Sequence, residues 1–370
     1  MPIPLRPNSR IIVLTEIEAM GGAERSVLAL SRWLHQHEIP NHVVTYIDHI
    51  GLAQYAEHPL DVVELRPEMR AAKKVAALRR YFAAHREAPR PLMSGYQPAL
   101  HATLAGMRGF HCLMHDTPSL FEAAAKLNLK RRIARRVSDV IIGFGLRSGG
   151  HTIVTSEYLR GECSREFNVR ADIARMGGLT SASPFRPRPV TNELRMLSVS
   201  RIEANKRIDW ILRALEALEH ESPVLSARVD WHLDVVGQGS ALGAMQQLAA
   251  NLGLAERVHF HGYLSDAELA KLYETTHLFL MPAVQGYGIP AIEALSRGIP
   301  VLLHRESGVS DILRRTPWAV VIDGKESSML TGLRQAIDNT LVGAQLSSPL
   351  PHLPTEDEWA TRVARLCNWL

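Results

Sequence analysis

The chain has 370 residues, of which 46% are hydrophobic and 22% are charged, and its formal net charge is +4. This length exceeds what one hydrophobic core usually supports and predicts two domains with the composition of an ordinary soluble globular protein. No apolar run reaches the roughly 18 residues of a membrane-spanning helix, and residues 1–10 lack a signal-peptide pattern, so the sequence argues against an integral membrane protein and predicts a cytoplasmic one.

The first half of the chain alternates short apolar runs with helical patterns. Residues 10–15 form the first run, and the pair Gly21 and Gly22 follows it directly before apolar residues at helical spacing. This order predicts a strand, a glycine loop and a helix. Basic residues mark a further helix over about 68–86. The other predicted strands of this half are 43–47, a segment near Leu92, 111–114, 140–142 and 151–155.

The second half repeats the same alternation after a break. Residues 181–193 hold three prolines in a polar setting and predict a linker between a domain of residues 1–180 and a domain of residues 194–354. A helix is expected over 207–218, and the predicted strands are 196–199, 231–236, 258–261, 278–281 and 301–303. Strands alternating with helices predict a parallel sheet, covered on both faces, in each domain.

The last segment, residues 355–370, has the pattern of an amphipathic helix. Thr355 and Glu358 stand at the spacing of a capping box, which satisfies two amides at a helix start. We expect this helix to pack back on the first domain. The residues predicted to share its apolar face are Trp359, Val363, Leu366 and Leu370.

A glycine-rich turn, residues 286–290, lies between the strand ending at Met281 and an apolar helix. In an α/β sheet this is the carboxyl end of a strand, where ligands bind. Glycines let the backbone approach a ligand closely, and the helix start offers amides to phosphate or sugar oxygens. Taken alone, the glycines fit a plain turn as well.

Six segments of the chain together resemble one family. Residues 284–301 resemble the signature of the retaining glycosyltransferases of family 4, which reads Glu-Gly-Phe-Gly, four residues, Glu-Ala and then Gly-x-Pro-Val. The other similar segments are 21–25, 115–116, 200–208, 235–239 and 261–263, in the family's order. The resemblance implies an α/β fold of the GT-B architecture, in which two Rossmann-like domains with parallel sheets face each other across a cleft.

The resemblance also implies which residues hold the donor. Arg201 and Lys206 match the positions that neutralise the diphosphate, and Glu293 matches the carboxylate that accepts the ribose hydroxyls. Gly262 and Tyr263 would offer backbone groups to the base. The remaining positions carried over to the donor site are Gly21, Gly22, Gly237, Gly286, Tyr287, Gly288 and Ile289.

Two further positions concern the transferred sugar. His115 follows an apolar strand, and the resemblance implies that it contacts this sugar or positions the acceptor. Gln285 stands where the family's signature has its first Glu. Glutamine still forms hydrogen bonds but carries no charge, so either the sugar preference is altered or the activity is weakened.

Basic residues are concentrated in the first half. Residues 1–185 hold 24 Lys and Arg against 17 Asp and Glu, whereas the remainder holds 18 against 21. Helices at 70–80 and 126–137 carry much of this charge. They fit either an anionic membrane surface at the inner face of the membrane or a solvated face that buries the narrow stripe Leu129, Ile133 and Val137. Nucleic acid is disfavoured, since no aromatic residues interleave with the charges.

The resemblance therefore implies a hexosyltransferase that retains anomeric configuration. It would move a sugar from a UDP- or GDP-sugar to a glycan or lipid-linked acceptor, as in polysaccharide or lipopolysaccharide biosynthesis, with no cofactor and no catalytic metal. Two alternatives stay open: a sugar-nucleotide epimerase of the same architecture, and a catalytically degenerate protein that binds a membrane or a partner.

Overall fold

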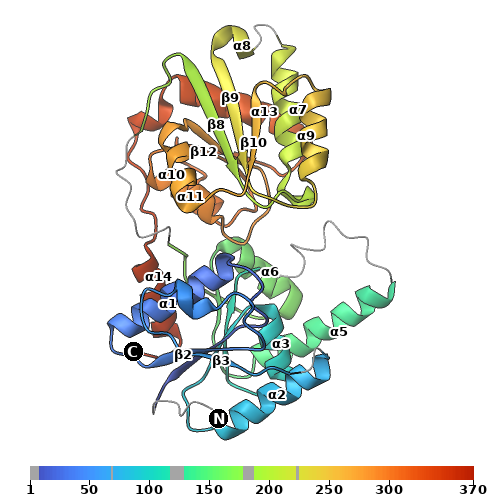
Figure 1. Ribbon diagram of the computed structural model, residues 1–370, viewed down its shortest axis with the longest axis vertical. Helices are drawn as coiled ribbons and strands as arrows, with labels where there is room; N and C mark the ends of the chain where they lie inside the picture. Colours follow the sequence, from blue (N-terminus) through green and yellow to red (C-terminus); the bar gives the residue numbers. More distant parts are fainter. Residues whose placement is uncertain (1–7, 68–69, 117–128, 178–186, 222–224) are drawn as a thin grey trace. The chain divides into compact units, whose positions relative to one another are not determined.

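The computed structural model describes residues 8–67, 70–116, 129–177, 187–221 and 225–370 (Figure 1). The chain divides into two compact units. The first unit comprises Met1–Gly177 and Pro354–Leu370, and the second comprises Gly178–Leu353. Residues 181–186 of the predicted linker lie outside the described residues.

The first unit is built on a seven-stranded sheet with the order β3-β2-β1-β4-β5-β6-β7. All of its pairs are parallel. Ile11, Ile12 and Val13 are each at most 1% exposed, so the central strand is buried on both faces, as parallel sheets require. The strands are β1 (Arg10–Val13), β2 (Asn41–Thr45), β3 (Val62–Glu64), β4 (Leu92–Ser94), β5 (His111–Met114), β6 (Thr152–Val154) and β7 (Asp172–Ile173).

Helices cover both faces of this sheet (Figure 1). Helix α1 packs against α14, whereas α2, α3, α5 and α6 pack in succession. The helical bounds are α1 (Gly22–Gln36), the 3₁₀ helix η1 (Leu52–Tyr55), α2 (Ala71–Ala84), α3 (Tyr96–Leu104), α5 (Leu129–Leu146), α6 (Glu157–Phe167) and α14 (Glu356–Leu366).

One predicted strand of the first unit is wrong. Residues 140–142 lie inside α5, where Ile142 is fully buried and Val140 is 71% exposed. Three apolar residues in a row satisfy a buried strand and one turn of a helix equally well. The contacts of α5 with α3 and α6 on one side settle the matter in favour of the helix.

Helix α14 begins as predicted and ends differently. Thr355 and Glu358 form the capping box, with Glu358 N donating to Thr355 Oγ1 at 3.1 Å. Trp359 and Val363 are buried, but Leu370 is 62% exposed, which corrects its place on the apolar face. The helix ends at Leu366, and the chain then turns so that Trp369 is buried in its place, with Nε1 donating to Arg90 O at 3.3 Å.

The second unit holds a six-stranded parallel sheet with the order β10-β9-β8-β11-β12-β13. Alternate residues of β8, β9 and β11 join α7 and α13 in one hydrophobic core. The strands are β8 (Glu193–Val199), β9 (Asp230–Val236), β10 (Val258–Gly262), β11 (Leu278–Met281), β12 (Val301–His304) and β13 (Ala319–Ile322). The helices are η2 (Ala204–Lys206), α7 (Ile208–Glu219), α8 (Leu225–Arg228), α9 (Leu242–Asn251), α10 (Asp266–Thr275), α11 (Ile289–Ser296), α12 (Ser310–Leu313), α13 (Glu326–Leu341) and η3 (Ala344–Ser347).

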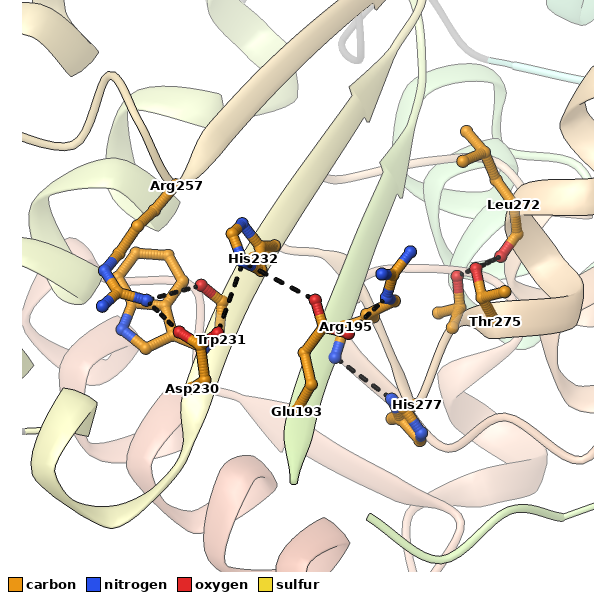
Figure 2. Close-up of polar contacts among 10 residues, drawn as sticks. Glu193, Arg195, Asp230, Trp231, His232, Arg257, Leu272, Thr275 and His277 are labelled. Atoms are coloured by element: carbon orange, nitrogen blue, oxygen red, sulfur yellow. Dashed lines mark hydrogen bonds and ion pairs between the residues drawn. The ribbon is translucent and has the colours of Figure 1, made fainter. Parts of the chain in front are cut away.

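A polar network lies at the amino ends of β8 and β9 (Figure 2). Arg257 donates to Asp230 Oδ1 at 2.7 Å, and Arg195 Nε donates to Glu193 Oε2 at 2.8 Å. The Arg195 amide donates to His277 Nδ1 at 3.1 Å, which ties β8 to the start of β11. These contacts hold the strands in register at the sheet edge opposite their carboxyl ends.

Candidate functional site

The strand order of the second unit reverses between β8 and β11. These two strands pair in parallel, with Met196 beside Leu278 and Leu197 beside Phe279. Their carboxyl ends therefore lie side by side and lead into the β8 loop (residues 200–207) and the β11 loop (residues 282–288). Ligands of open α/β sheets bind in the crevice at such a reversal. The predicted donor residues Arg201, Lys206 and Gly286–Gly288 all lie in these two loops.

The β8 loop is anchored through its backbone. Ile202 is fully buried, and its amide donates to Gln238 O at 2.8 Å while its carbonyl accepts the Ala241 amide at 3.0 Å. Arg201, next to this anchor, is exposed. Lys206 closes η2 and is half-buried. The loop thus holds Arg201 open to solvent and two more cations, Lys206 and Arg207, at the start of α7.

Gly237 and Gly239 make this anchor possible. A Cβ on Gly237 would lie 1.9 Å from Ser200 O, and a Cβ on Gly239 would lie 2.3 Å from Ile202 O. Gly237 also has φ of 136°, a conformation that only glycine adopts readily. Gly237 was predicted to bind the donor. In the structure it positions the β8 loop, because it allows the loop backbone to approach closely.

Gly237→Ala is expected to lower the free energy of unfolding by about 3 kcal/mol, because both the backbone conformation and the contact with Ser200 resist a side chain. Urea unfolding followed by circular dichroism measures the change. Gly243→Ala is the matched control, since a Cβ at this position in α9 meets nothing within 4 Å and alanine favours the helix. Equal urea midpoints for Gly237→Ala and the wild type would contradict the assigned role.

The β11 loop is buried and paired with the residues after β12. Gly286, Tyr287 and Gly288 are buried, whereas Gln285 is half-buried. The amide of Gly308 donates to Gln285 O at 3.1 Å, and the amide of Val309 donates to Tyr287 O at 3.0 Å. These bonds use the backbone of the loop and do not involve the Gln285 side chain.

Gly288 turns the β11 loop into α11. Its φ is 108°, and a Cβ would lie 2.6 Å from Met281 Cε, so the position requires glycine. Ile289 is the first residue of the helix, and Pro290 follows it. Proline has no amide hydrogen and suits a first turn. The helix start therefore presents the amides before Pro290 at the strand reversal.

Glu293 lies within α11 and is held by a neighbouring helix. It is 8% exposed, and Tyr273 of α10 donates its hydroxyl to Glu293 Oε2 at 3.1 Å. The Arg297 guanidinium lies 4.6 Å from the centre of the Tyr273 ring, and its NH1 donates to Glu293 O at 2.9 Å. Burial and the adjacent carboxylate raise the pKa of Tyr273 well above its ordinary value, so the tyrosine remains a donor. No sequence pattern indicated Tyr273, because its contact with Glu293 joins two helices.

Gly262 and Tyr263 lie at the end of β10. The Gly262 carbonyl accepts the Gly237 amide at 2.8 Å, so one of the backbone groups assigned to the base is already engaged within the protein. The Tyr263 side chain is 76% exposed. A planar base could stack on such a ring.

In the first unit, Gly21 and Gly22 stand at the start of α1. The Gly21 amide donates to Glu24 Oε2 at 3.0 Å, and a Cβ on Gly21 would lie 2.8 Å from the same oxygen. Gly22 is exposed. The first amide expected to meet a diphosphate is therefore satisfied by an acidic side chain, which would have to rotate away for a phosphate to take its place.

His115 lies directly after β5, as predicted. Its Nε2 lies 3.0 Å from Ser94 Oγ, at the end of the neighbouring strand β4. Burial lowers the pKa of His115 to about 4. The imidazole is therefore neutral at pH 7 and suits hydrogen bonding to a sugar hydroxyl. Sequence reasoning missed Ser94, whose place at a strand end was the available signal.

Acid is expected to destabilise the first unit through its buried histidines. Burial lowers the pKa of His42, His111 and His115 to about 4. In the unfolded chain the pKa of these histidines is about 6.5. Between pH 6.5 and 4 the unfolded chain therefore binds protons that the folded chain does not bind, so the free energy of unfolding falls as the pH is lowered through this range. Each histidine adds about 1.4 kcal/mol per pH unit within that window.

Urea unfolding at several pH values between 7 and 4 measures this slope. His111→Gln should make the slope shallower, because it removes one of the three groups. His220→Gln is the control, since this histidine is 76% exposed and should leave the slope unchanged. The same slope in His111→Gln and the wild type would contradict the argument.

Comparisons with known proteins match the second unit to a family model and both units to solved structures. Residues 181–345, within the second unit, match the family model of glycosyl transferases group 1. A GDP-mannose-dependent alpha-(1-6)-phosphatidylinositol monomannoside mannosyltransferase of Mycobacterium tuberculosis is 25% identical over 296 residues, or 74% of this chain and 72% of that protein. A D-inositol 3-phosphate glycosyltransferase of Streptomyces griseus is 32% identical over 136 residues, or 35% of this chain and 28% of that protein.

Solved structures resemble both units. Anabaena Alr3699/HepE in complex with UDP and glucose aligns with a TM-score of 0.72 at 14% identity, covering 98% of this chain and 100% of that one. WaaG, a glycosyltransferase involved in lipopolysaccharide biosynthesis, aligns with a TM-score of 0.69 at 17% identity, covering 95% and 99%. The predicted pair of parallel-sheet, Rossmann-like domains of the GT-B type is confirmed. The family model and the names of the relatives confirm the predicted enzyme class, a glycosyltransferase.

Proposed function

We propose that the chain is a retaining hexosyltransferase similar to those of family 4, which takes its sugar from a UDP- or GDP-sugar. The observation that carries the proposal is the reversal between β8 and β11, which brings the loop of Arg201 and Lys206 beside the loop that leads to Glu293. Two cations and a buried carboxylate at one sheet edge suit a nucleoside diphosphate, which has an anionic end and a hydroxylated end.

Each group has one task in the proposed reaction. As the bond from the sugar to the diphosphate breaks, negative charge grows on the phosphate oxygens, and Arg201 and Lys206 stabilise it. Glu293 accepts hydrogen bonds from the ribose hydroxyls. The acceptor hydroxyl attacks the sugar carbon from the face of the leaving group and gives its proton to a phosphate oxygen. In this scheme side-chain cations take the place of a catalytic metal.

The transferred sugar would contact residues that are polar without being charged. Gln285 replaces the carboxylate of the family's signature and offers both an amide donor and a carbonyl acceptor. His115, neutral because burial lowers its pKa to about 4, would contact the sugar or position the acceptor. The acceptor in the proposal is a glycan or a lipid-linked sugar, and the relative that uses GDP-mannose acts on a phosphatidylinositol monomannoside, as its name says.

Calorimetric titration with UDP, GDP and ADP tests the donor site. We expect one diphosphate to bind with micromolar affinity, and the matching sugar nucleotides then define the donor. Turnover of the sugar nucleotide without any acceptor, followed by chromatography, would instead identify the epimerase. If none of the three diphosphates binds, the donor site fails and the catalytically degenerate alternative replaces it.

The proposal also includes an anionic membrane surface as a partner when the acceptor is lipid-linked. No helix in the described part of the chain is both long and apolar enough to cross a membrane. Attachment would therefore rest on surface helices, and the two basic helices predicted from the sequence, 70–80 and 126–137, are the candidates. Residues 126–128 of the second lie outside the described residues.

A further inference from the structure

Helix α5 carries a row of large apolar side chains on its solvent-exposed face. Ile133 is 55% exposed, Val137 54%, Val140 71% and Phe144 56%. Their spacing of four, three and four residues places them on one side of the helix, over a length of about 16 Å. They account for four of the ten exposed large hydrophobic side chains among the described residues. We call these four residues the α5 stripe.

The inner face of the same helix is held by polar contacts. Arg135 lies 3.3 Å from Asp139 Oδ2 and 3.1 Å from Glu166 Oε2, and Tyr96 donates to Asp139 Oδ1 at 3.1 Å. Ile142 is buried beside this cluster. Solvated helices of globular proteins usually turn apolar residues inward. The α5 stripe therefore excludes the solvated alternative predicted for Ile133 and Val137, in which they are buried.

A further cation borders the C-terminal end of the α5 stripe. The Arg108 guanidinium lies 5.4 Å from the centre of the Phe144 ring. Figure 1 shows the first turns of α5 extending beyond α3. A row of exposed apolar side chains on one helix face marks an interaction site more often than singly scattered ones do.

Basic side chains border the α5 stripe on both sides. Lys130 lies on one side of it, and Arg132 and Arg136 lie on the other, by the helical period of 100° per residue. All three are exposed. Asp139, the single acidic residue in the sequence of α5, is turned inward. An apolar stripe between basic margins complements an anionic lipid surface, where apolar groups reach the acyl chains and cations meet the headgroups.

Helix α2, the other basic helix, lacks these features. Lys74 pairs with Glu16, and Arg79 donates to Ala105 O at 2.9 Å. Among its large apolar residues, Leu78 is fully buried, and Val75, Tyr81 and Phe82 are half-buried rather than exposed. Cations without exposed apolar groups give only weak, salt-sensitive attraction to a membrane. Because only α5 combines basic residues with a row of exposed apolar residues, we choose α5 rather than α2 as the helix that meets a membrane.

We propose that α5 is the membrane-docking element of the chain, lying in the interface of an anionic bilayer with the α5 stripe turned toward the acyl chains. The inference deepens the proposed function and rests on the anionic membrane partner included there, because it names the helix that would dock. Vesicle binding is measured without any catalytic step, whereas the donor site is tested by calorimetry. Loss of docking can therefore be distinguished from loss of the donor site.

Co-sedimentation with vesicles tests the docking. The wild type should sediment with phosphatidylcholine mixed with phosphatidylglycerol and stay in solution with phosphatidylcholine alone. The stripe variant combines Ile133→Gln, Val137→Gln, Val140→Gln and Phe144→Gln, which keep helix propensity and should weaken binding at least about a hundredfold. The charge variant combines Lys130→Gln, Arg132→Gln and Arg136→Gln and should weaken it by about a hundredfold.

A matched control removes the same charge from α2, with Arg70→Gln, Lys73→Gln and Arg80→Gln, and should bind vesicles as the wild type does. Circular dichroism checks that every variant is folded. Three results would overturn the proposal: no vesicle binding by the wild type, undiminished binding by the stripe variant, or equal loss in the α2 control. Light scattering could give a fourth contrary result. In it the wild type forms a dimer, the stripe variant does not, and neither protein binds vesicles.

Discussion

Replacing Glu293 by alanine is expected to lower the affinity for the preferred nucleoside diphosphate by at least about a hundredfold. A hydrogen bond to a charged group contributes about 1.5–3 kcal/mol, and the carboxylate is proposed to accept two from the ribose. Its position is set before any ligand arrives, because Tyr273 and the turn of α11 hold it in an 8%-exposed site. Calorimetry of the wild type and the variant measures the change.

Two variants separate binding from folding in this experiment. Tyr273→Phe keeps the carboxylate and removes the 3.1 Å hydrogen bond that orients it, so affinity should fall by about tenfold, less than for Glu293→Ala. Glu306→Ala, an exposed carboxylate after β12, should bind the diphosphate as the wild type does. Undiminished affinity in a folded Glu293→Ala would remove the ribose role of Glu293.

Removing Arg201 or Lys206 from the β8 loop should mainly slow the chemical step. Arg201→Ala and Lys206→Ala are each expected to lower kcat by about 10²–10³, the usual effect of removing one group that stabilises transition-state charge. KM should change less, since the charge on the phosphates grows only as the sugar leaves. Steady-state transfer from the matching sugar nucleotide gives both constants.

Arg213→Ala is the matched control for these cations. It removes an exposed arginine from α7, away from the β8 loop, and should leave both constants unchanged. Rates near the wild-type value in Arg201→Ala and Lys206→Ala would contradict the electrostatic role. Abolition of transfer by a chelator would do so as well, because a metal would then carry the charge that the proposal gives to these side chains.

Local patterns predicted most of the strands and helices correctly. The capping box at Thr355 and the glycine turn before α11 were predicted because each depends on residues within a few positions of one another. The errors occur where local patterns are ambiguous. Residues 140–142 satisfy both strand and helix periods, and the chain after Leu366 buries Trp369 rather than Leu370. Only packing against the rest of the first unit decides such cases.

The candidate site shows the same division. Family resemblance supplied Arg201, Lys206 and Glu293 from short motifs, but it gave no sign of Tyr273 or Ser94, which contact Glu293 and His115 from other elements. These contacts join residues 20 and 21 positions apart. No period or spacing encodes them, because they depend on how helices and strands pack side by side.

The sequence by itself determined the alternation of buried strands and amphipathic helices, and with it two parallel sheets, since a side-chain period is a local property. Only the tertiary structure decided the strand order, which brings the β8 and β11 loops together at one sheet edge. It also decided which face of α5 points outward, because the ion pair of Arg135 with Glu166 holds the opposite face against α6. Both outcomes rest on contacts between segments distant in the chain, whose free energy no local pattern contains.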